Sequence, residues 1–247
     1  MHVLCSLFLG KGHCGGKITD VNHGEKKGRD STGQRYSEYD EELSQLSPSK
    51  WFHVKTVLET GNPSRNVIEK IFKTTTTDIT RCSVSIKQVL KLNHSIETLE
   101  RFESFREDVK NKACEHNNKH PRNMVDGNER LLFYGTNVTF CKKIATSNLC
   151  RDSNCNICIL IKSGFHITKH KTGIWLSTSC QDLINANTMK MKMAIIVCRV
   201  IIGRVVDMLD GDIEGNYDSM REAKSNYVCV KNPSSVLPCF VIILNCT

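Results

Sequence analysis

Four cysteines in the second half of the chain have the spacing of metal ligands. They are Cys141, Cys150, Cys155 and Cys158, in the pattern Cys-x8-Cys-x4-Cys-x2-Cys. Two thiolates separated by two residues can reach one tetrahedral zinc ion from a single turn, and four sulfurs complete the coordination of a structural ion. The spacing therefore predicts a structural zinc site in the cysteine-rich segment 141–170. A four-sulfur site has no open coordination position, so we do not expect catalytic zinc.

The same cysteines allow three other interpretations. His166 and His170 follow the close pair and would give a Cys2His2 ligand set, although the seven-residue gap is shorter than the usual finger loop of about 12 residues. Free cysteine is among the most buried residue types, so these thiols could simply be packed in a core. A redox pair requires Cys-x-x-Cys to open a helix beside a β–α–β unit, and the sequence gives no sign of that context.

Apolar periodicity indicates the elements that would hold these residues. Residues 1–50 are rich in Gly, Ser and charged residues and predict a flexible arm, followed by one domain over 51–247. The segment NVIEKIFK fits a short helix or strand, and CSVSIKQVLKLN fits a strand. Ser95 can cap a helix whose apolar stripe is formed by Leu99, Phe102, Phe105 and Val109.

The remaining chain is dominated by short apolar runs. The segment NKHPRNMVDGN predicts a loop from its Pro, Gly and Asn content. The strand-length runs after it are RLLFYGT, GIWLST, MAIIVCRVIIGRV, NYVCV and VLPCFVIIL. One helix followed by many short strands predicts an α+β domain with a mostly antiparallel sheet.

Bulk composition sets limits on compartment and partners. The chain has 247 residues, 13 cysteines and a net charge of +8. An odd number of cysteines and no clear secretion signal favour an intracellular protein, nuclear or cytoplasmic, whose thiols are reduced or bind metal. The longest apolar runs are too short to span a bilayer, which needs about 20 residues. The basic residues are spread along the chain, which favours a solvated surface over a dedicated nucleic-acid face.

Three stretches resemble, in order, the catalytic domain of the poly(ADP-ribose) polymerase superfamily. They are SIKQVLKLNHSIETLERFESFREDVK, NERLLFYGT and GIWLS. The second is similar to that family's Asn-Glu-Arg-x-Leu-x-His-Gly-Thr strand and the third to its Gly-Ile-Tyr-Phe-Ala/Ser strand. The cysteine-bearing insert is closer still to a plant group of C2H2 zinc-finger-related proteins with a polymerase-like domain. This resemblance, strongest over 84–243, implies an ADP-ribosyltransferase fold and favours the four-cysteine ligand set.

The resemblance also implies a His-Tyr-Glu triad that transfers ADP-ribose from NAD. Tyr134 stands at the His position and Trp175 at the Tyr position; Tyr227 stands at the Glu position, or Asn226 if the register shifts by one. Trp175 can still stack on a flat ring and Tyr134 can still donate a hydrogen bond. Neither a tyrosine with a pKa of about 10 nor an amide supplies the anion that stabilises positive charge on the sugar. We therefore expect a catalytically degenerate domain.

Several functions remain compatible with these residues. The family uses the backbone of the residue at Gly135 to bind nicotinamide, so weak NAD binding by Tyr134, Gly135, Thr136 and Trp175 is one expectation. The opposite expectation is that the aromatic residues fill the pocket. We predict an interaction or weak NAD-binding module with an unidentified protein partner and no membrane. The alternatives are a weak mono-ADP-ribosyltransferase, with Glu222 as a displaced carboxylate, and a zinc-containing nucleic-acid-binding protein.

Overall fold

The computed structural model describes residues 52–76, 84–115, 121–138, 155–167, 173–187, 192–208 and 217–246. The chain divides into two units, Met1–Ser47 and Pro48–Thr247, and every described residue belongs to the second. The predicted arm therefore lies outside the described residues, and so do Cys141, Cys150 and His170. In the described part of the chain, no helix is long and apolar enough to cross a membrane.

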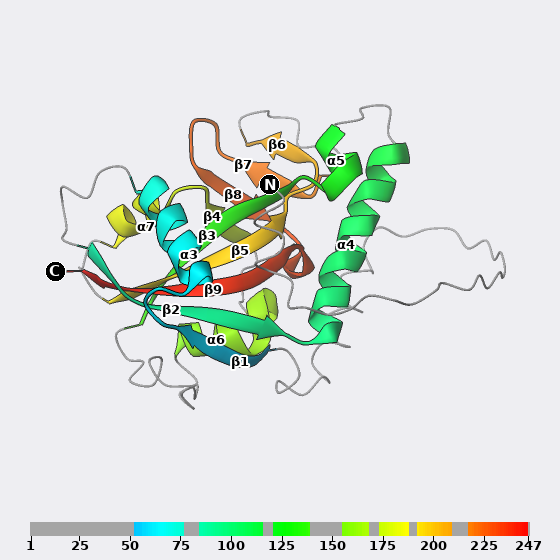
Figure 1. Ribbon diagram of the computed structural model, residues 1–247. Coiled ribbons are helices and arrows are strands. Elements are labelled where there is room, and N and C mark those ends of the chain that lie inside the picture. Colours follow the sequence, from blue (N-terminus) through cyan, green and yellow to red (C-terminus); the bar gives the residue numbers. More distant parts are fainter. Residues whose placement is uncertain are drawn as a thin grey trace. The chain divides into compact units, whose positions relative to one another are not determined.

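A nine-stranded sheet forms the centre of this unit (Figure 1). The strand order is β1-β2-β9-β5-β3-β4-β8-β7-β6, and every neighbouring pair is antiparallel except β6 and β7. The strands are β1 (Phe52–Leu58), β2 (Val84–His94), β3 (Glu129–Asn137), β4 (Ile174–Ser177), β5 (Met193–Ile201), β6 (Val205–Asp207), β7 (Ser219–Arg221), β8 (Tyr227–Val230) and β9 (Val236–Cys246). The predicted mixed α/β class with a mostly antiparallel sheet is confirmed.

Short helices connect these strands. They are α3 (Pro63–Thr74), α4 (Ile96–Glu115), α5 (Pro121–Asp126), α6 (Asn156–Ser163), α7 (Cys180–Ala186) and the 3-10 turns η2 (Gly164–Ile167) and η3 (Pro233–Ser235). The NVIEKIFK segment is helical because Asn62 caps α3, accepting from the backbone N–H of Ser64 at 2.9 Å, with Pro63 as the first helical residue. Ser95 caps α4 as predicted, since its Oγ accepts from the N–H of Thr98 at 3.3 Å.

Two predictions of local structure were wrong. The segment predicted as a loop contains helix α5, which begins at Pro121 and is held by the Arg122–Asp126 ion pair at 2.6 Å. The run MAIIVCRVIIGRV is not one strand, because the chain turns after β5 at Gly203, where φ is +54°. A Cβ at Gly203 would meet the carboxylate of Asp218 at 2.2 Å, so a side chain does not fit there.

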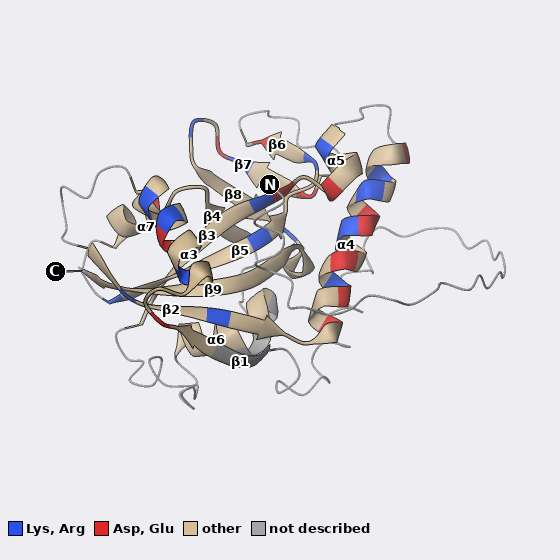
Figure 2. Ribbon diagram, in the orientation of Figure 1, with Lys and Arg blue, Asp and Glu red and all other residues tan. Residues whose placement is uncertain are grey.

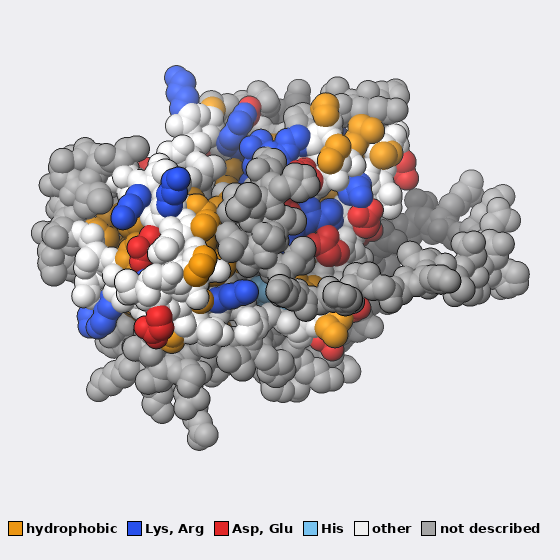
Figure 3. All heavy atoms as spheres, viewed as in Figure 1, with side chains coloured by type: hydrophobic (Ala, Val, Ile, Leu, Met, Phe, Trp, Pro, Cys, Tyr) orange, Lys and Arg blue, Asp and Glu red, His pale blue; other side chains and the backbone are white. Residues whose placement is uncertain are grey.

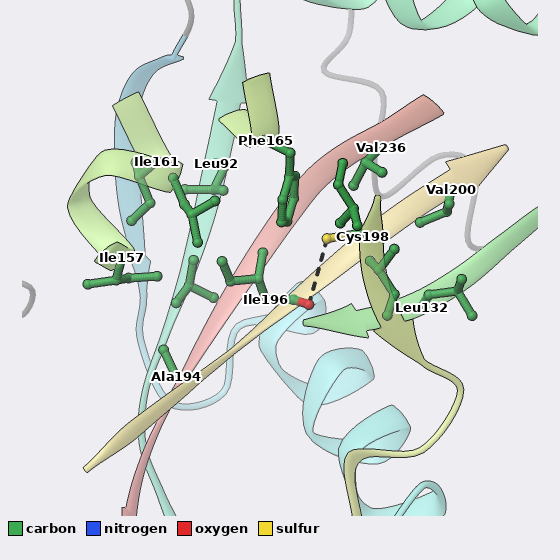
Figure 4. Packing of buried hydrophobic residues seen from close by; sticks show 14 of the residues in the cluster. Leu92, Leu132, Ile157, Ile161, Phe165, Ala194, Ile196, Cys198, Val200 and Val236 are labelled. Carbon is green, nitrogen blue, oxygen red and sulfur yellow. Dashed lines mark hydrogen bonds between the residues drawn. The ribbon is translucent and has the colours of Figure 1, made fainter. Parts of the chain in front are cut away.

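The sheet has two buried faces, which we name after helices that cover them. On the α6 face, α6 and η2 pack against alternate residues of the central strands (Figure 4). The buried side chains there include Leu92, Leu132, Ile157, Ile161, Phe165, Ala194, Ile196, Cys198, Val200 and Val236. The intervening residues, such as Phe133, Ile195 and Ile242, point to the opposite α7 face. Strand β5 is buried at all nine positions because both of its faces are covered.

Candidate functional site

The first end of strand β3 is held by charged side chains. Glu129 bonds Arg199 of β5 through two contacts, at 2.7 and 3.0 Å, and also accepts from Arg106 of α4 at 2.5 Å. Burial alone would raise the pKa of Glu129, but hydrogen bonds and attraction from the two arginines outweigh it and lower the pKa. Preceding Glu129, Asn128 adopts a left-handed conformation with φ of +57°, and its Nδ2 donates to the carbonyl of Gly203 at 3.2 Å.

An aromatic ring completes this end of the strand. The guanidinium carbons of Arg106 and Arg199 both lie 5.2 Å from the centre of the buried Phe102 ring. Phe102 belongs to the apolar stripe of α4, whose outer surface carries alternating acidic and basic residues (Figure 2). The Asn-Glu pair of NERLLFYGT therefore joins β3 to β5 and α4. Its role in the described structure is to hold elements together.

The other end of β3 carries the residues predicted to bind NAD. Tyr134 points to the α6 face, where its ring meets Phe165 edge-on with the centroids 5.0 Å apart. Burial there raises the pKa of the Tyr134 hydroxyl above its ordinary value. Thr136 lies on the same face by alternation, and Gly135 points to the α7 face. Neighbouring residues of the predicted site are thus divided between the two sides of the sheet.

Trp175 and Tyr227 lie on the face opposite Tyr134. In β4 and β8, Ile174, Leu176 and Val228 belong to the α6-face core. Trp175 and Tyr227 alternate with these residues and therefore point to the α7 face. The three triad positions identified from the sequence do not converge: Trp175 and Tyr227 share the α7 face with Gly135, but Tyr134 does not.

The ladder between β3 and β4 opens at this site. These strands share a single paired position, Phe133 with Ser177, whereas β4 pairs with β8 along its whole length. Continuing the β3–β4 register by two residues would place Gly135 opposite Trp175. The split therefore falls between the two residues at which the family resemblance locates the nicotinamide.

The α7 side of Gly135 is occupied by Leu183. A Cβ built on Gly135 would lie 3.3 Å from Leu183 Cδ2 and 3.4 Å from Leu183 Cβ. Carbon atoms in optimal contact lie about 3.5–4.0 Å apart, so Leu183 already fills the space beside this glycine. The residues on this face do not accommodate a nicotinamide ring against Gly135 while α7 holds this position.

A carboxylate lies next to the predicted Glu position, on a different element. Asp182 of α7 accepts from Asn226 Nδ2 at 2.8 Å and from Ser177 Oγ at 3.4 Å. The pKa of the Tyr227 hydroxyl is raised, first by burial and then by the negative charge of Asp182. Tyr227 is thus neutral near pH 7, and the anion of this cluster is Asp182.

Asp182 and Leu183 were missed by sequence reasoning. Both lie in SCQDLIN, directly after the GIWLS motif, and Asp182 stands in the first turn of α7, where acidic residues are favoured at the positive end of the helix dipole. An acidic residue at that position is ordinary, so the sequence gives no sign that Asp182 lies close to Asn226. Glu222, the proposed displaced carboxylate, is exposed and follows β7. The short distance to Asn226 belongs to Asp182.

Helix α7 is tied to α3 at its first turn. The carbonyl of Thr75, at the end of α3, accepts from the backbone N–H of Gln181 at 3.1 Å and from Ser179 Oγ at 3.2 Å. Ser177 Oγ accepts from the N–H of Ser179 at 3.0 Å. These contacts fix the helix that carries Asp182 and Leu183.

The close cysteine pair opens helix α6. Cys155 is its N-cap residue and Cys158 lies in its first turn, and both side chains are buried in the α6-face core. The pair thus has one of the two features that a redox pair requires, the start of a helix. However, α6 connects β3 and β4, which pair antiparallel, so it is not part of a β–α–β unit.

The predicted zinc ligands cannot be assembled from the described residues. Among the side chains that the structure describes, no three His, Cys, Asp or Glu residues form a group able to hold a metal ion. Cys141, Cys150 and His170 lie outside the described residues, and the His166 side chain is not described. The zinc site therefore stays a prediction, with two of its four cysteines placed at the start of α6.

Surface charge and sequence comparison add little to the assignment. On the face seen in Figure 3, Lys and Arg side chains are interspersed with Asp and Glu. A scan against protein-family models and a search of curated proteins found no match to this sequence.

Proposed function

We propose that this chain is a poly(ADP-ribose) polymerase-like domain that has lost transferase chemistry and acts as an interaction module. The resemblance of three ordered motifs supports the family assignment. The mixed fold is compatible with it, because the motifs lie on β2 and α4, on β3 and on β4, with β3 and β4 adjacent in one sheet. Under this assignment the cysteine insert connects the two strands that would flank nicotinamide, so zinc would stabilise a connection beside the pocket.

The observation that carries the loss of chemistry is the residue at the Glu position, where Tyr227 is neutral near pH 7 and Asn226, in the shifted register, is an uncharged amide. Losing a preorganised electrostatic group of this kind typically costs about 10²–10³ in rate. At the His position, Tyr134 is packed on Phe165 on the α6 face, whereas Trp175 and Tyr227 lie on the α7 face. We infer that NAD-dependent transfer is absent and that NAD binding is weak at most.

A weak mono-ADP-ribosyltransferase is the second candidate, and one observation favours it. Asp182 supplies a carboxylate 2.8 Å from Asn226, the residue at the Glu position in the shifted register. An anion on α7 could stabilise positive charge on a ribose bound against the same face. The enzyme candidate therefore assigns Asp182 as its carboxylate.

Radiolabelled NAD separates the two candidates. For the interaction module we expect no label on the purified full-length chain or on added acceptor protein, and the same result for Asp182→Asn. Labelling that disappears in Asp182→Asn would overturn the proposal and establish the enzyme. Labelling that persists in Asp182→Asn would also overturn it, with a different residue as the carboxylate. Glu222→Gln is the comparison variant, because Glu222 is the exposed acid that the sequence offers as a displaced carboxylate, and labelling lost only in this variant would assign the role to Glu222.

A further inference from the structure

We propose that helix α7 is a built-in plug, with Leu183 occupying the position of a flat heteroaromatic ring against Gly135. This inference rests on the proposed function, because the family resemblance defines which ligand the split between β3 and β4 would take. It goes further by assigning the closure to one side chain and one helical contact. It starts from the observation that Leu183 fills the space beside Gly135, where NAD was expected to bind.

Leu183 packs against Gly135 on the α7 face of the sheet. Gly135 lies near the end of β3 and is half-buried, and its lack of a side chain leaves room for another group beside the strand. Leu183 occupies this space, with three of its carbon atoms 3.3–3.6 Å from the position of a Gly135 Cβ. A ring stacked on Gly135 needs the same shell of contact distance, so ring and leucine exclude each other.

Hydrogen bonds to two neighbouring segments hold helix α7 in place: one is the end of α3, and the other is the residue that precedes β8. At its start, the Thr75 carbonyl accepts from Gln181 N–H and Ser179 Oγ, which connects α7 to α3. On the side of β8, Asp182 accepts from Asn226. Within α7, Cys180 and Ile184 are buried, at 0% and 5% exposure. Leu183 is thus the member of a fixed helix that points at Gly135, and it is not a mobile surface residue.

The two hydrogen bonds to the Thr75 carbonyl hold α7 beside Gly135, and we call them the latch. Helix α3 precedes residue 84, so the latch comes from outside the strongest part of the family resemblance. A ligand that requires an open site is bound with an affinity reduced by the fraction of molecules in the open state. Removing the leucine, or weakening the latch, should therefore increase apparent affinity without adding a contact to the ligand.

Ligand titration of the full-length chain tests the plug directly. Nicotinamide and NAD are titrated into the wild type, Leu183→Ala and Ile184→Ala, with binding followed by ligand-observed NMR and calorimetry. Ile184 is the matched control: its truncation removes a neighbouring buried side chain of α7 that is not among the atoms facing Gly135. We expect Leu183→Ala to bind both ligands at least about tenfold more tightly than the wild type, with no gain for Ile184→Ala.

Two further variants make the result specific. Adding Gly135→Ala to Leu183→Ala places a methyl group in the vacated space and should cancel the gain. Ser179→Ala removes one bond of the latch and should give a smaller gain than Leu183→Ala. If circular dichroism shows that Leu183→Ala is unfolded, Leu183→Val decides the question, since it shortens the side chain by one carbon and retains an apolar contact.

The possible failures are distinguishable. Equal affinity of the wild type, Leu183→Ala and Ile184→Ala would overturn the plug and leave the interaction module standing. A gain of the same size in both alanine variants would show general loosening of α7, which also overturns it. Transfer of label from NAD by the wild type would instead overturn the proposed function, and with it the premise that the site is closed.

Discussion

The two ends of strand β3 differ in what their motif residues do. At the first end, Asn128 and Glu129 match the polymerase-like pattern and are engaged with α4, β5 and the turn at Gly203. At the second end, Tyr134 replaces the histidine of the pattern, and the ladder to β4 opens after one pair. Only Gly135 and Thr136 continue the pattern there. The same short strand is thus fixed at one end and altered at the other.

The difference between the two ends of β3 identifies Glu129 as a structural residue of the motif. Glu129 is shared by the buried Arg199 and the half-buried Arg106, and removing one partner of such a group costs stability. Changing Glu129 alone should therefore destabilise the fold whether or not the chain is active. Tyr134 carries no comparable constraint, because an aromatic ring packs well against Phe165. A motif can therefore persist at its structural end after its chemical end has changed.

The largest expected effect is the loss of zinc from the cysteine insert, which follows the second end of β3. Replacing Cys155 and Cys158 by Ser should remove one zinc ion per chain and lower the free energy of unfolding by more than about 5 kcal/mol, because structural zinc contributes about 10 kcal/mol or more in small domains. Metal content is measured by mass spectrometry and stability by urea titration.

The control for this variant is Cys198→Ser, which changes a fully buried thiol of the same core without touching the proposed ligands. It should retain zinc. If the freshly purified wild type contains no zinc, the metal prediction is wrong and the pair serves only to pack the start of α6. The difference between the two ends of β3 would then rest only on the ion pairs of Glu129.

Glu129→Gln tests the first end and should have the next largest effect. It keeps the shape of the side chain but removes the charge nearest to Arg199 and leaves the more exposed Glu103 of α4 as the remaining anion, 2.7 Å from Arg106 and 3.8 Å from Arg199. We therefore expect a loss of about 3 kcal/mol in the free energy of unfolding, at the lower end of the cost of breaking a buried ion pair. Asp182→Asn is the same kind of change beside the second end. The new amide can still accept from Asn226, so its cost should stay below about 1 kcal/mol. Equal losses in urea titrations at pH 7 would remove the distinction between the two ends.

Periodic features of the fold could be predicted from the sequence. The apolar stripe and serine cap of α4, and the strand-length apolar runs, were sufficient because local spacing decides which face a side chain occupies. The short helix α5 was missed because the segment NKHPRNMVDGN that contains it is rich in Pro, Gly and Asn. Proline is also a favourable first residue of a helix, and the Arg122–Asp126 pair supports the turn that follows.

The candidate site could be predicted only in part. Motif matching located Gly135, Trp175 and Tyr227 on strand-length runs, and the structure adds that β3 and β4 are neighbours. Alternation along the predicted strand implies that Tyr134 and Gly135 face opposite sides of the sheet, but it does not say what covers each side. The contacts of Asp182 and Leu183 depend on how α7 lies over the sheet. Such tertiary contacts have no signature in local spacing.

A further expected effect, smaller than that of Glu129→Gln, is a pH dependence beside Arg199 of β5. His94, the last residue of β2, has a pKa lowered to about 4, chiefly by burial and then by the positive charges of Arg199 and Lys91. Well above pH 6.5 the side chain is neutral in the folded and unfolded states and contributes nothing to the pH dependence of stability. As the pH falls from 6.5 towards 4, only the unfolded chain gains the proton, so the folded state loses stability.

The expected loss from His94 is about 2 kcal/mol between pH 7 and pH 5, obtained by integrating the proton uptake of the unfolded state. Glu129 does not interfere in this window, because its pKa is lowered and it titrates at more acidic pH. Urea titrations at the two pH values should show the loss in the wild type and little of it in His94→Gln, since glutamine does not titrate. If His94→Gln loses as much as the wild type, the acid sensitivity belongs to other groups. A reduced loss would mean that His94 stays neutral in the folded state because burial, and then the charge of Arg199, disfavour its protonated form.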